Sequence, residues 1–228
     1  MIIAALVSSL LLARKIGDFR IGGNLGNWKS LKDVYNEAQN CKKCALHENR
    51  KNVVFGSGND KAVVMFIGEA PGYYEDIQGE PFVGAAGKLL NKLLNSVELK
   101  REQVYIANVI KCRPPKNRDP LAEEIDICKD YLYAQIYFIN PQVICTLGNF
   151  ATKLILKKNV GITSVRGKLF KVGGRLVLPI YHPAAALYTP SYIPSLEEDF
   201  ITIKKVIEKE IKIHIEDEME SKEQLGLF

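Results

Sequence analysis

Short apolar runs alternate along this chain with longer segments in which apolar residues recur every three or four positions. The short runs predict buried β-strands, and the longer periodic segments predict amphipathic helices. Strands are expected at residues 62–67, 104–109, 142–147, 167–172 and 176–181. Helices are expected at residues 31–38, 84–99, 120–138, 149–157 and 196–210. Because strands and helices alternate, we expect a mostly parallel sheet with helices on both of its faces.

Local signals mark the ends of two helices and divide the chain. Ser30 can cap the first helix, and Asp119 is expected to cap the third, with Pro120 at its first helical position. Residues 73–84 contain several turn residues and are expected to be irregular. We divide the chain into a poorly packed extension at 1–27, one domain at 28–211 and a charged tail at 212–228.

Composition agrees with a single globular domain. The chain has 228 residues, of which 47% are hydrophobic and 25% are charged, so one sizeable core can form. Its formal charge of +5 permits an anionic partner without requiring one. The apolar segment 1–13 is too short to span a bilayer, and its positive charges follow it, unlike those of a signal peptide. We therefore expect a poorly packed extension or an unused upstream start codon, with a membrane-contacting segment as the minor alternative. The protein is expected to be cytoplasmic and to have no membrane partner.

Four of the five cysteines suggest a metal site. Cys41 and Cys44 form a C-x-x-C pair after the first helix, and Cys112 and Cys128 lie in and after a proline-rich coil. Four thiolates suit zinc or an iron–sulfur cluster, and this spacing does not choose between them. Four unrelated buried thiols are the alternative, although three of these cysteines lie in polar loops. Cys145 is inside a predicted strand and is most simply a core residue.

Polar side chains follow the ends of three predicted strands. The first strand ends in the turn Gly68-Glu69-Ala70-Pro71-Gly72, the second at Asn108, and the last in His182-Pro183-Ala184-Ala185. Because the carboxyl ends of parallel strands share one edge of a sheet, these groups should converge in one crevice. Phe82 lies in a turn-rich segment near that crevice. Each residue alone has a structural explanation, and only their convergence indicates a hydrogen-bonding pocket.

A basic coil and a run of small residues are candidates for phosphate contacts. The run at 83–87 starts a predicted helix, whose free N–H groups can bind a phosphate. The coil lies beside a cysteine and the crevice, which favours phosphate contact over a merely solvated loop. Its basic residues are Lys111, Arg113, Lys116 and Arg118.

These motifs resemble family 4 uracil-DNA glycosylases, the iron–sulfur branch of the uracil-DNA glycosylase superfamily. The resemblance covers about residues 31–205 and follows the family's order and spacing. Its motifs are Cys41-x-x-Cys44, Gly68-Glu69-Ala70-Pro71-Gly72, Gly79-Glu80-Pro81-Phe82-Val83-Gly84, Asn108 followed by Lys111-Cys112-Arg113-Pro114-Pro115, Cys128, and His182-Pro183-Ala184-Ala185. The fold that it implies is a three-layer α/β/α arrangement with a central, mostly parallel four-stranded sheet.

The resemblance also implies a cofactor. The family has a 4Fe-4S cluster that is regarded as structural rather than redox-active. Here its ligands would be Cys41, Cys44, Cys112 and Cys128. Such a cluster would tie an N-terminal segment to the basic coil and hold Arg113, Lys116 and Arg118 in position against DNA.

The activity that the resemblance implies is removal of uracil from single- and double-stranded DNA. The enzyme would flip the nucleotide out and hydrolyse its N-glycosidic bond, which leaves free uracil and an abasic site. Phe82 would stack on the uracil, Asn108 would bind its O4/N3 edge, and the backbone at 68–70 would contact O2 and the water. A neutral His182 would donate a hydrogen bond to O2 of the leaving uracil.

Two positions depart from the best-known branch of the superfamily. There, an aspartate positions the water and a nearby tyrosine excludes the methyl group of thymine, whereas the corresponding residues here are Ala70 and Gly72. Glu69 is our candidate for positioning the water or for excluding the methyl group. After the histidine the family often has an arginine, and this chain has Leu187 and Tyr188 as candidate wedges for the gap left by the flipped base.

Other partners and other function classes are also considered. The terminal segment Gln224-Leu225-Gly226-Leu227-Phe228 resembles peptides that dock in sliding-clamp grooves, although it can equally pack on its own domain. We expect a monomeric prokaryotic protein associated with the nucleoid. A metal-stapled DNA-binding protein without catalysis is the main alternative. An iron–sulfur electron carrier is a further one, against which the converging pocket residues argue.

Overall fold

A seven-stranded sheet forms the centre of the protein, with the strand order β1-β3-β2-β4-β6-β5-β7. The computed structural model describes residues 27–208 and 218–219. The predicted N-terminal extension, except for its last residue, and the terminal clamp-like segment therefore lie outside the described residues, as does most of the predicted tail.

Four parallel strands make the middle of the sheet. They are β3 (Tyr105–Asn108), β2 (Val64–Gly68), β4 (Val143–Leu147) and β6 (Arg175–Ile180). Three short strands extend the edges: β1 (Ser57–Gly58) and β5 (Phe170–Val172) are antiparallel to their neighbours, and β7 (Glu218–Met219) is parallel to β5. The prediction of a mostly parallel sheet with four central strands is thus confirmed. The three edge strands raise the total number of strands to seven.

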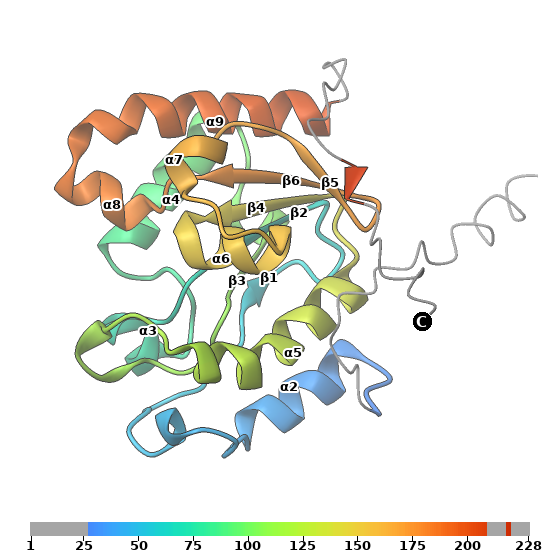
Figure 1. The fold of residues 1–228 in the computed structure, drawn as a ribbon, viewed down its shortest axis with the longest axis vertical. Coiled ribbons are helices and arrows are strands. Elements are labelled where there is room, and N and C mark those ends of the chain that lie inside the picture. The colour runs from blue at the N-terminus through green and yellow to red at the C-terminus, as the bar shows by residue number, and fades with distance from the viewer. Residues whose placement is uncertain (1–26, 209–217, 220–228) are drawn as a thin grey trace, which may run out of the picture.

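Helices cover both faces of the sheet, as the three-layer prediction requires (Figure 1). One face packs against α4 (Ala85–Ser96), α8 (Pro183–Tyr188) and α9 (Ile193–Ile207), and the other against α2 (Leu31–Gln39), α5 (Ala122–Ile139) and α6 (Gly148–Leu156). The remaining helical segments are short, namely α3 (Tyr73–Gln78), α7 (Ile162–Val165), and the 3-10 turns Ala45–His47, Arg101–Gln103, Pro115–Asn117 and Pro190–Tyr192.

Strand β2 shows why its run of apolar residues is continuous. Every residue of β2 is buried, because successive side chains of a strand point to opposite faces and both faces are covered. Met65 contributes to the core beneath α2 and α5, whereas Phe66 contributes to the core beneath α4 and α9. There the Phe66 ring stacks on Phe200 of α9 with 5.6 Å between ring centroids.

Two helix starts test the local signals. Helix α2 begins after Ser30, whose Oγ accepts a hydrogen bond from the Asp33 N–H at 3.2 Å, as predicted. The start predicted for α5 at Pro120 is wrong by two residues, since the helix begins at Ala122. Glu124 explains the delay, because its carboxylate accepts from the Leu121 N–H at 2.8 Å and caps the helix there.

The segment predicted to be irregular contains helix α3. Isolated helices of this length are unstable in water, so tertiary contacts must hold α3 in place. Buried Asp76 supplies one of them, since its Oδ1 accepts hydrogen bonds from the N–H groups of Lys51 at 2.9 Å and Asn52 at 3.3 Å. The helix was not predicted because the turn residues on either side of it favour irregular structure in the sequence. None of the described helices is long and apolar enough to cross a membrane.

Candidate active site and cysteine site

The carboxyl ends of the parallel strands bring the predicted pocket residues together. Gly68 ends β2 and pairs in register with Asn108, which ends β3, while His182 follows β6. A Cβ atom on Gly68 would lie 2.4 Å from Asn108 Oδ1 and 2.7 Å from Phe82 Cζ. Only glycine therefore permits this close approach, and the three residues form one site.

Asn108 carries an unpaired acceptor inside the protein. Its side chain is 2% exposed, and its Oδ1 has no hydrogen-bond partner among the described residues. A buried carbonyl oxygen without a partner costs about 1–3 kcal/mol. This atom is therefore placed to accept a hydrogen bond from a ligand that enters the crevice.

Phe82 forms the second wall of the crevice. Its ring lies 5.5 Å from the His182 ring, centroid to centroid, with an angle of 28° between the planes. The backbone of Phe82 has φ of +54°, in the left-handed region that side chains other than glycine rarely adopt. Such strain persists only where the surrounding structure holds it.

Two charged side chains hold the strained turn at Phe82 from opposite sides. Glu75 of α3 accepts hydrogen bonds at its Oε1 from the N–H groups of Val83 at 3.0 Å and Gly84 at 2.9 Å. Arg101 donates to the carbonyl oxygen of Phe82 at 3.3 Å and also to that of Pro81. The sequence gives no signal for either residue, because neither lies next to Phe82 in the sequence or belongs to a recognisable motif.

The beginning of α4 is consequently not a free phosphate site. The Glu75 carboxylate occupies the N–H groups that precede the helix, and a carboxylate at a helix N-terminus is stabilised by the helix dipole. Small residues are present there for another reason: a Cβ atom on Gly87 would lie 1.8 Å from the carbonyl oxygen of Phe82. The phosphate site expected at residues 83–87 is therefore wrong for this turn.

His182 is neutral at physiological pH, and its tautomer is set by the backbone. Burial lowers the pKa of His182 to about 4, although the nearby Glu75 charge opposes the shift. Its Nδ1 accepts a hydrogen bond from the Ala184 N–H at 3.1 Å. Because a neutral imidazole has one donor and one acceptor, Nε2 carries the proton. His182 thus presents a neutral N–H donor.

The side chain of Glu69 has a raised pKa. Burial, with a smaller effect from the charge of Asp119, raises the pKa of Glu69 to about 7. The neighbouring backbone is already engaged, since the carbonyl oxygens of Gly68 and Glu69 accept from Val109 at 2.9 Å and Ile110 at 3.2 Å. Ala70 packs against the core beneath α2 and α5. The Glu69 carboxyl is therefore the titratable group of this turn, in equilibrium between its charged and neutral forms near pH 7.

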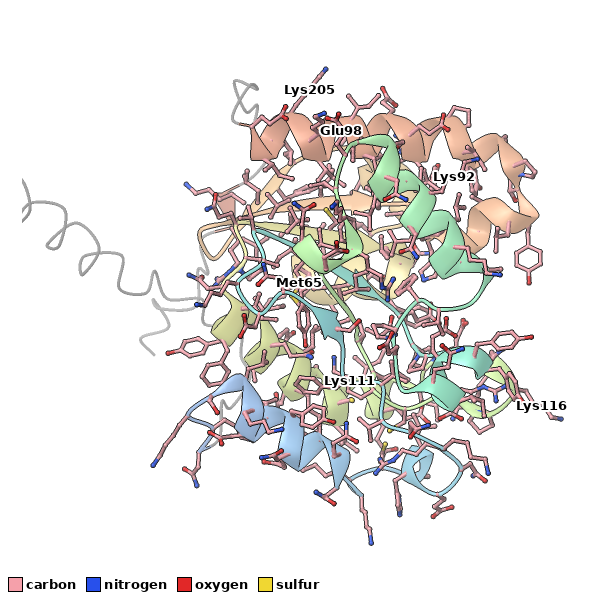
Figure 2. The ribbon with its side chains drawn as sticks, turned by 180° about the vertical axis from the view of Figure 1, so that it is seen from behind. Met65, Lys92, Glu98, Lys111, Lys116 and Lys205 are labelled. Atoms are coloured by element: carbon pink, nitrogen blue, oxygen red, sulfur yellow. The ribbon has the colours of Figure 1, made fainter. Side chains whose placement is uncertain are left out.

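The expected basic coil divides into buried, paired and exposed residues. Lys111 does not belong to a basic surface: it is 1% exposed, and its Nζ donates to the Asn108 carbonyl oxygen at 2.7 Å and to Gln135 Oε1 at 2.6 Å. Arg118 forms a two-pronged ion pair with Glu124, with N–O distances of 2.9 and 2.6 Å. Figure 2 shows the contrast between Lys111 inside the protein and Lys116 at its outer edge.

Arg113 and the two candidate wedge residues lie at the surface around the crevice. The Arg113 Nε donates to Asn117 Oδ1 at 2.7 Å, and its guanidinium lies 5.0 Å from the centre of the Tyr73 ring. Leu187 and Tyr188 end α8, the helix that follows His182, and they are 45% and 90% exposed. An almost fully exposed tyrosine so near the pocket is available to a bound molecule.

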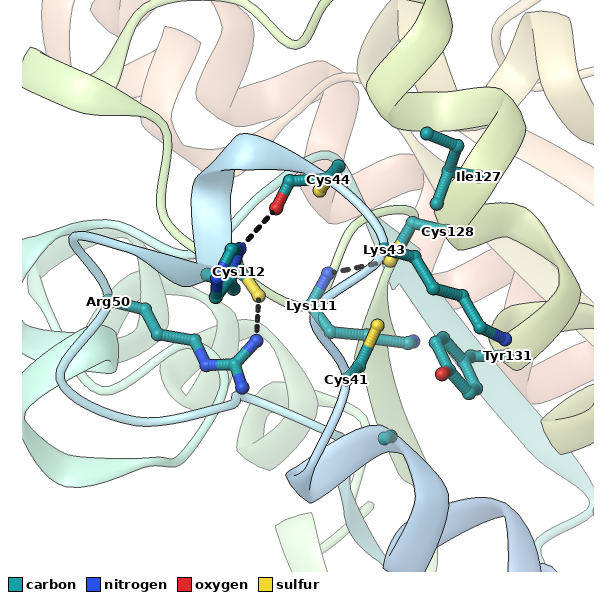
Figure 3. Close-up of a pocket in the computed structure, with 11 residues that line it drawn as sticks. Cys41, Lys43, Cys44, Arg50, Lys111, Cys112, Ile127, Cys128 and Tyr131 are labelled. Carbon is teal, nitrogen blue, oxygen red and sulfur yellow. Dashed lines mark hydrogen bonds between the residues drawn. The ribbon is translucent and has the colours of Figure 1, made fainter.

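The four predicted metal ligands line one hollow beside α2 and α5. Figure 3 shows these cysteines coming from separate segments of the chain. All are free thiols, and they are Cys41, Cys44, Cys112 and Cys128. Cys145 is apart from them, fully buried in β4, as expected.

Hydrogen-bond donors surround the sulfur atoms. Arg50 Nη1 lies 3.3 Å from Cys112 Sγ, and the Lys111 backbone N–H lies 3.3 Å from Cys128 Sγ (Figure 3). Donors of this kind stabilise thiolates that bind metal. Within residues 27–208, no three His, Cys, Asp or Glu side chains are grouped so that they could hold one metal ion. Cysteine thiolates are ligands of both iron–sulfur clusters and structural zinc sites, so the four residues present fit either group.

Comparison with known proteins identifies the family. The profile of the uracil DNA glycosylase superfamily matches residues 55–204. The chain belongs to the uracil-DNA glycosylase superfamily. Its relatives include type-4 uracil-DNA glycosylases from Archaeoglobus fulgidus, Saccharolobus solfataricus and Sulfurisphaera tokodaii, which are 49%, 51% and 50% identical. These alignments cover 79%, 76% and 78% of this chain, and 95%, 85% and 84% of the relatives.

The superfamily match agrees with the geometry of the crevice. It includes Gly68, Phe82, Asn108 and His182, which the fold brings together, and it begins after the C-x-x-C pair. The crevice therefore belongs to the part of the chain that the superfamily as a whole shares. The similarity to type-4 uracil-DNA glycosylases confirms the family suggested by the sequence motifs.

Removing the Glu75 carboxylate is expected to loosen the Phe82 turn. A hydrogen bond to a charged group contributes about 1.5–3 kcal/mol. Amide hydrogen exchange at Val83 and Gly84 should therefore be ~10- to 100-fold faster in Glu75→Ala, since local opening costs correspondingly less. Exposed Glu80, in the same loop, provides the control, because Glu80→Ala removes a carboxylate that makes neither of these bonds. Equal exchange in the two variants would contradict the role of Glu75.

Proposed function

We propose that this protein removes uracil from DNA by hydrolysing the N-glycosidic bond of a flipped deoxyuridine. One observation carries the proposal: Phe82, Asn108 and His182 meet at one edge of the sheet, and the Asn108 Oδ1 is buried without a partner. Membership of the uracil-DNA glycosylase superfamily and identities of 49–51% to type-4 enzymes support it. The reaction class is that of a hydrolase in DNA repair.

Recognition of the base follows from the amide of Asn108. Uracil has an N–H donor at N3 and an acceptor at O4, which complement the acceptor and the donor of an amide. Cytosine has the opposite pattern at these atoms, so it would leave the buried Oδ1 unpaired in this orientation. Phe82, held in its strained turn, offers a ring face on which the base stacks.

His182 acts on the leaving group. As the bond between C1′ and N1 lengthens, negative charge develops on uracil and positive charge on the sugar. The Nε2–H of neutral His182 donates to uracil O2, where that negative charge accumulates. A donor that is already oriented stabilises developing charge without reorganisation. Uracil leaves with the bonding electron pair and water adds to C1′. The water then loses a proton to solvent, and the uracil anion takes up a proton, which gives free uracil and an abasic site.

Glu69 is proposed to position the attacking water. In its ionised form the carboxylate accepts a hydrogen bond from water and aligns the water's oxygen with C1′. Its pKa of about 7 means that this form becomes dominant above neutral pH. Excluding the methyl group of thymine is the second role that its place in the turn permits. Gly68 and Ala70 contribute backbone to the same wall.

DNA contacts are proposed for residues at the surface around the crevice. Arg113 and Lys116 would contact phosphates, and Leu187 or Tyr188 would fill the gap left by the flipped base. A phosphate contact by Arg118 is less favoured than the sequence suggested, because Glu124 already pairs with its guanidinium. A contact to phosphate would have to compete with that pair.

A 4Fe-4S cluster is proposed at Cys41, Cys44, Cys112 and Cys128. When bound, it would supply a covalent crosslink between α5, the segment after α2 and the beginning of the coil that leaves β3. The chain's own residues surround it with donors, and Lys111 joins this region to the Asn108 carbonyl. The proposed role is therefore to hold the base-reading strand end in position.

Further properties proposed for the protein concern its partners. Uracil in both single- and double-stranded DNA would be the substrate, and the protein would act as a monomer. Docking of Gln224–Phe228 on a sliding clamp remains a proposal from the sequence alone. The alternative function, a metal-stapled protein that binds DNA without catalysis, would use the same surface but would release no base.

Release of uracil tests the function directly. Purified protein and a deoxyuridine-containing duplex should give free uracil and alkali-labile abasic sites. The His182→Ala variant should be about 100- to 1,000-fold slower in single turnover, the usual loss for one donor to a developing anion. Intact DNA binding without release by the wild type would favour the non-catalytic alternative.

A pH profile tests Glu69. The wild-type single-turnover rate should fall as the pH drops through about 7, because protonation removes the carboxylate. Glu69→Gln should be about 100-fold slower than the wild type at pH 8 and should lack this inflection. His182 titrates at about 4, outside the window. An unchanged single-turnover rate in Glu69→Gln would exclude the water-positioning role.

Iron analysis tests the cluster. The wild type should contain about four iron and four sulfide per chain, and Cys112→Ala should lose most of both. Cys145→Ala is the matched control, because this buried cysteine lies in the sheet and away from the hollow. Loss of iron in both variants, or one zinc ion in the wild type, would contradict the assignment.

A further inference from the structure

The outer face of α3 exposes three large apolar side chains. Tyr73, Tyr74 and Ile77 are 52%, 60% and 47% exposed, and together they are called the α3 aromatic face. The two rings meet edge to face with 5.4 Å between their centroids. Burial of an apolar side chain contributes about 1.5–3 kcal/mol, so exposing three of them on one short helix needs an explanation.

The opposite side of α3 is fixed to the protein. Asp76 is buried and accepts from the backbone of Lys51 and Asn52, while Glu75 accepts from Val83 and Gly84. The helix that carries the exposed rings is therefore held in place by these hydrogen bonds. They are also close to the crevice, since the Tyr74 Cδ2 is 3.7 Å from the position that a Cβ atom on Gly84 would take.

Positive charge accompanies the rings. The Arg113 guanidinium lies 5.0 Å from the centre of the Tyr73 ring, a favourable cation–π geometry. Lys116 projects from the same coil at the outer edge of the molecule, on the side where α3 lies (Figures 1 and 2). Aromatic rings combined with cations along a groove are typical of proteins that bind single-stranded nucleic acid, because bases stack on the rings and phosphates pair with the cations.

We propose that the α3 aromatic face binds unpaired bases of single-stranded DNA next to the crevice. Tyr73 and Tyr74 supply the stacking surfaces, and Arg113 and Lys116 contact the adjoining phosphates. The location beside a flipped base rests on the proposed function, whereas affinity for a single strand does not require catalysis. Duplex DNA gains less from this face, since its bases already stack on one another. The face thus favours single-stranded substrates.

Binding of uracil-free DNA tests the proposal. The affinity of the full-length protein for a fluorescent oligothymidylate and for a uracil-free duplex is measured by anisotropy at one salt concentration. The double variant Tyr73→Ala/Tyr74→Ala should bind the single strand at least about 10-fold more weakly, the loss expected when base stacking is removed. Its affinity for the duplex should change less than about threefold. Tyr73→Phe/Tyr74→Phe should restore single-strand binding, because it keeps both rings.

Tyr35→Ala is the matched control. Tyr35 is an exposed tyrosine on α2 with Lys32 Nζ 4.8 Å from its ring centre, so it has the same pairing of ring and cation elsewhere on the surface. Its removal should not change binding. Tyr74→Ser removes only the more exposed ring of the face and should give an intermediate loss without affecting the fold. Unchanged single-strand affinity in the double variant, or equal losses for single strand and duplex, would overturn the proposal.

The outcomes also separate this inference from the proposed function. A wild type that releases no uracil, together with a selective loss of single-strand binding in the double variant, would refute the glycosylase and support the binding face. Normal uracil release by the wild type, together with unchanged single-strand binding in the double variant, would support the glycosylase and refute the binding face. Free uracil should bind the double variant and the wild type alike, since neither ring is in the crevice.

Discussion

The buried ammonium group of Lys111 links the two sites of this protein. Its Nζ bridges the Asn108 carbonyl oxygen and Gln135 Oε1, and its own backbone N–H reaches Cys128 Sγ. Burial lowers the pKa of Lys111 to about 8, so the charge is costly to place there and the two acceptors must offset that cost. Gln135 continues the network to the Phe55 carbonyl oxygen at 2.8 Å. The end of β3 is therefore held from the side of the cysteine site.

Phe82 depends on a second set of charges, on the other side of the crevice. Its left-handed backbone is held by Glu75 at the following N–H groups and by Arg101 at the carbonyl oxygens. Because Glu75 belongs to α3, the same short helix holds the turn at Phe82 and presents two tyrosines at the surface. The proposed base-stacking ring and the proposed single-strand contact thus depend on the same helix.

Much of the site could be predicted from the sequence, because strand ends and their turn residues are local signals. Gly68, Asn108 and His182 each follow a predicted strand, and parallel strands bring their carboxyl ends to one edge. The four cysteines, far apart in sequence, also line one hollow as expected. Glu75, Arg101 and the burial of Lys111 could not be predicted, since each depends on a partner elsewhere in the fold.

The sequence by itself determined the order of the central strands and the long helices, the family, and the residue types that face the crevice, because periodicity and turn chemistry are encoded locally. Only the tertiary structure decided which charged side chains are buried and with which partners they pair. It buried Lys111, paired Arg118 with Glu124 and filled the start of α4 with a carboxylate. The physical reason is that the electrostatic free energy of a charged side chain depends on its surroundings. It differs between water, a position beside an opposite charge and the core, and the residue type does not reveal which of these applies. Only the folded chain specifies which of these environments it meets.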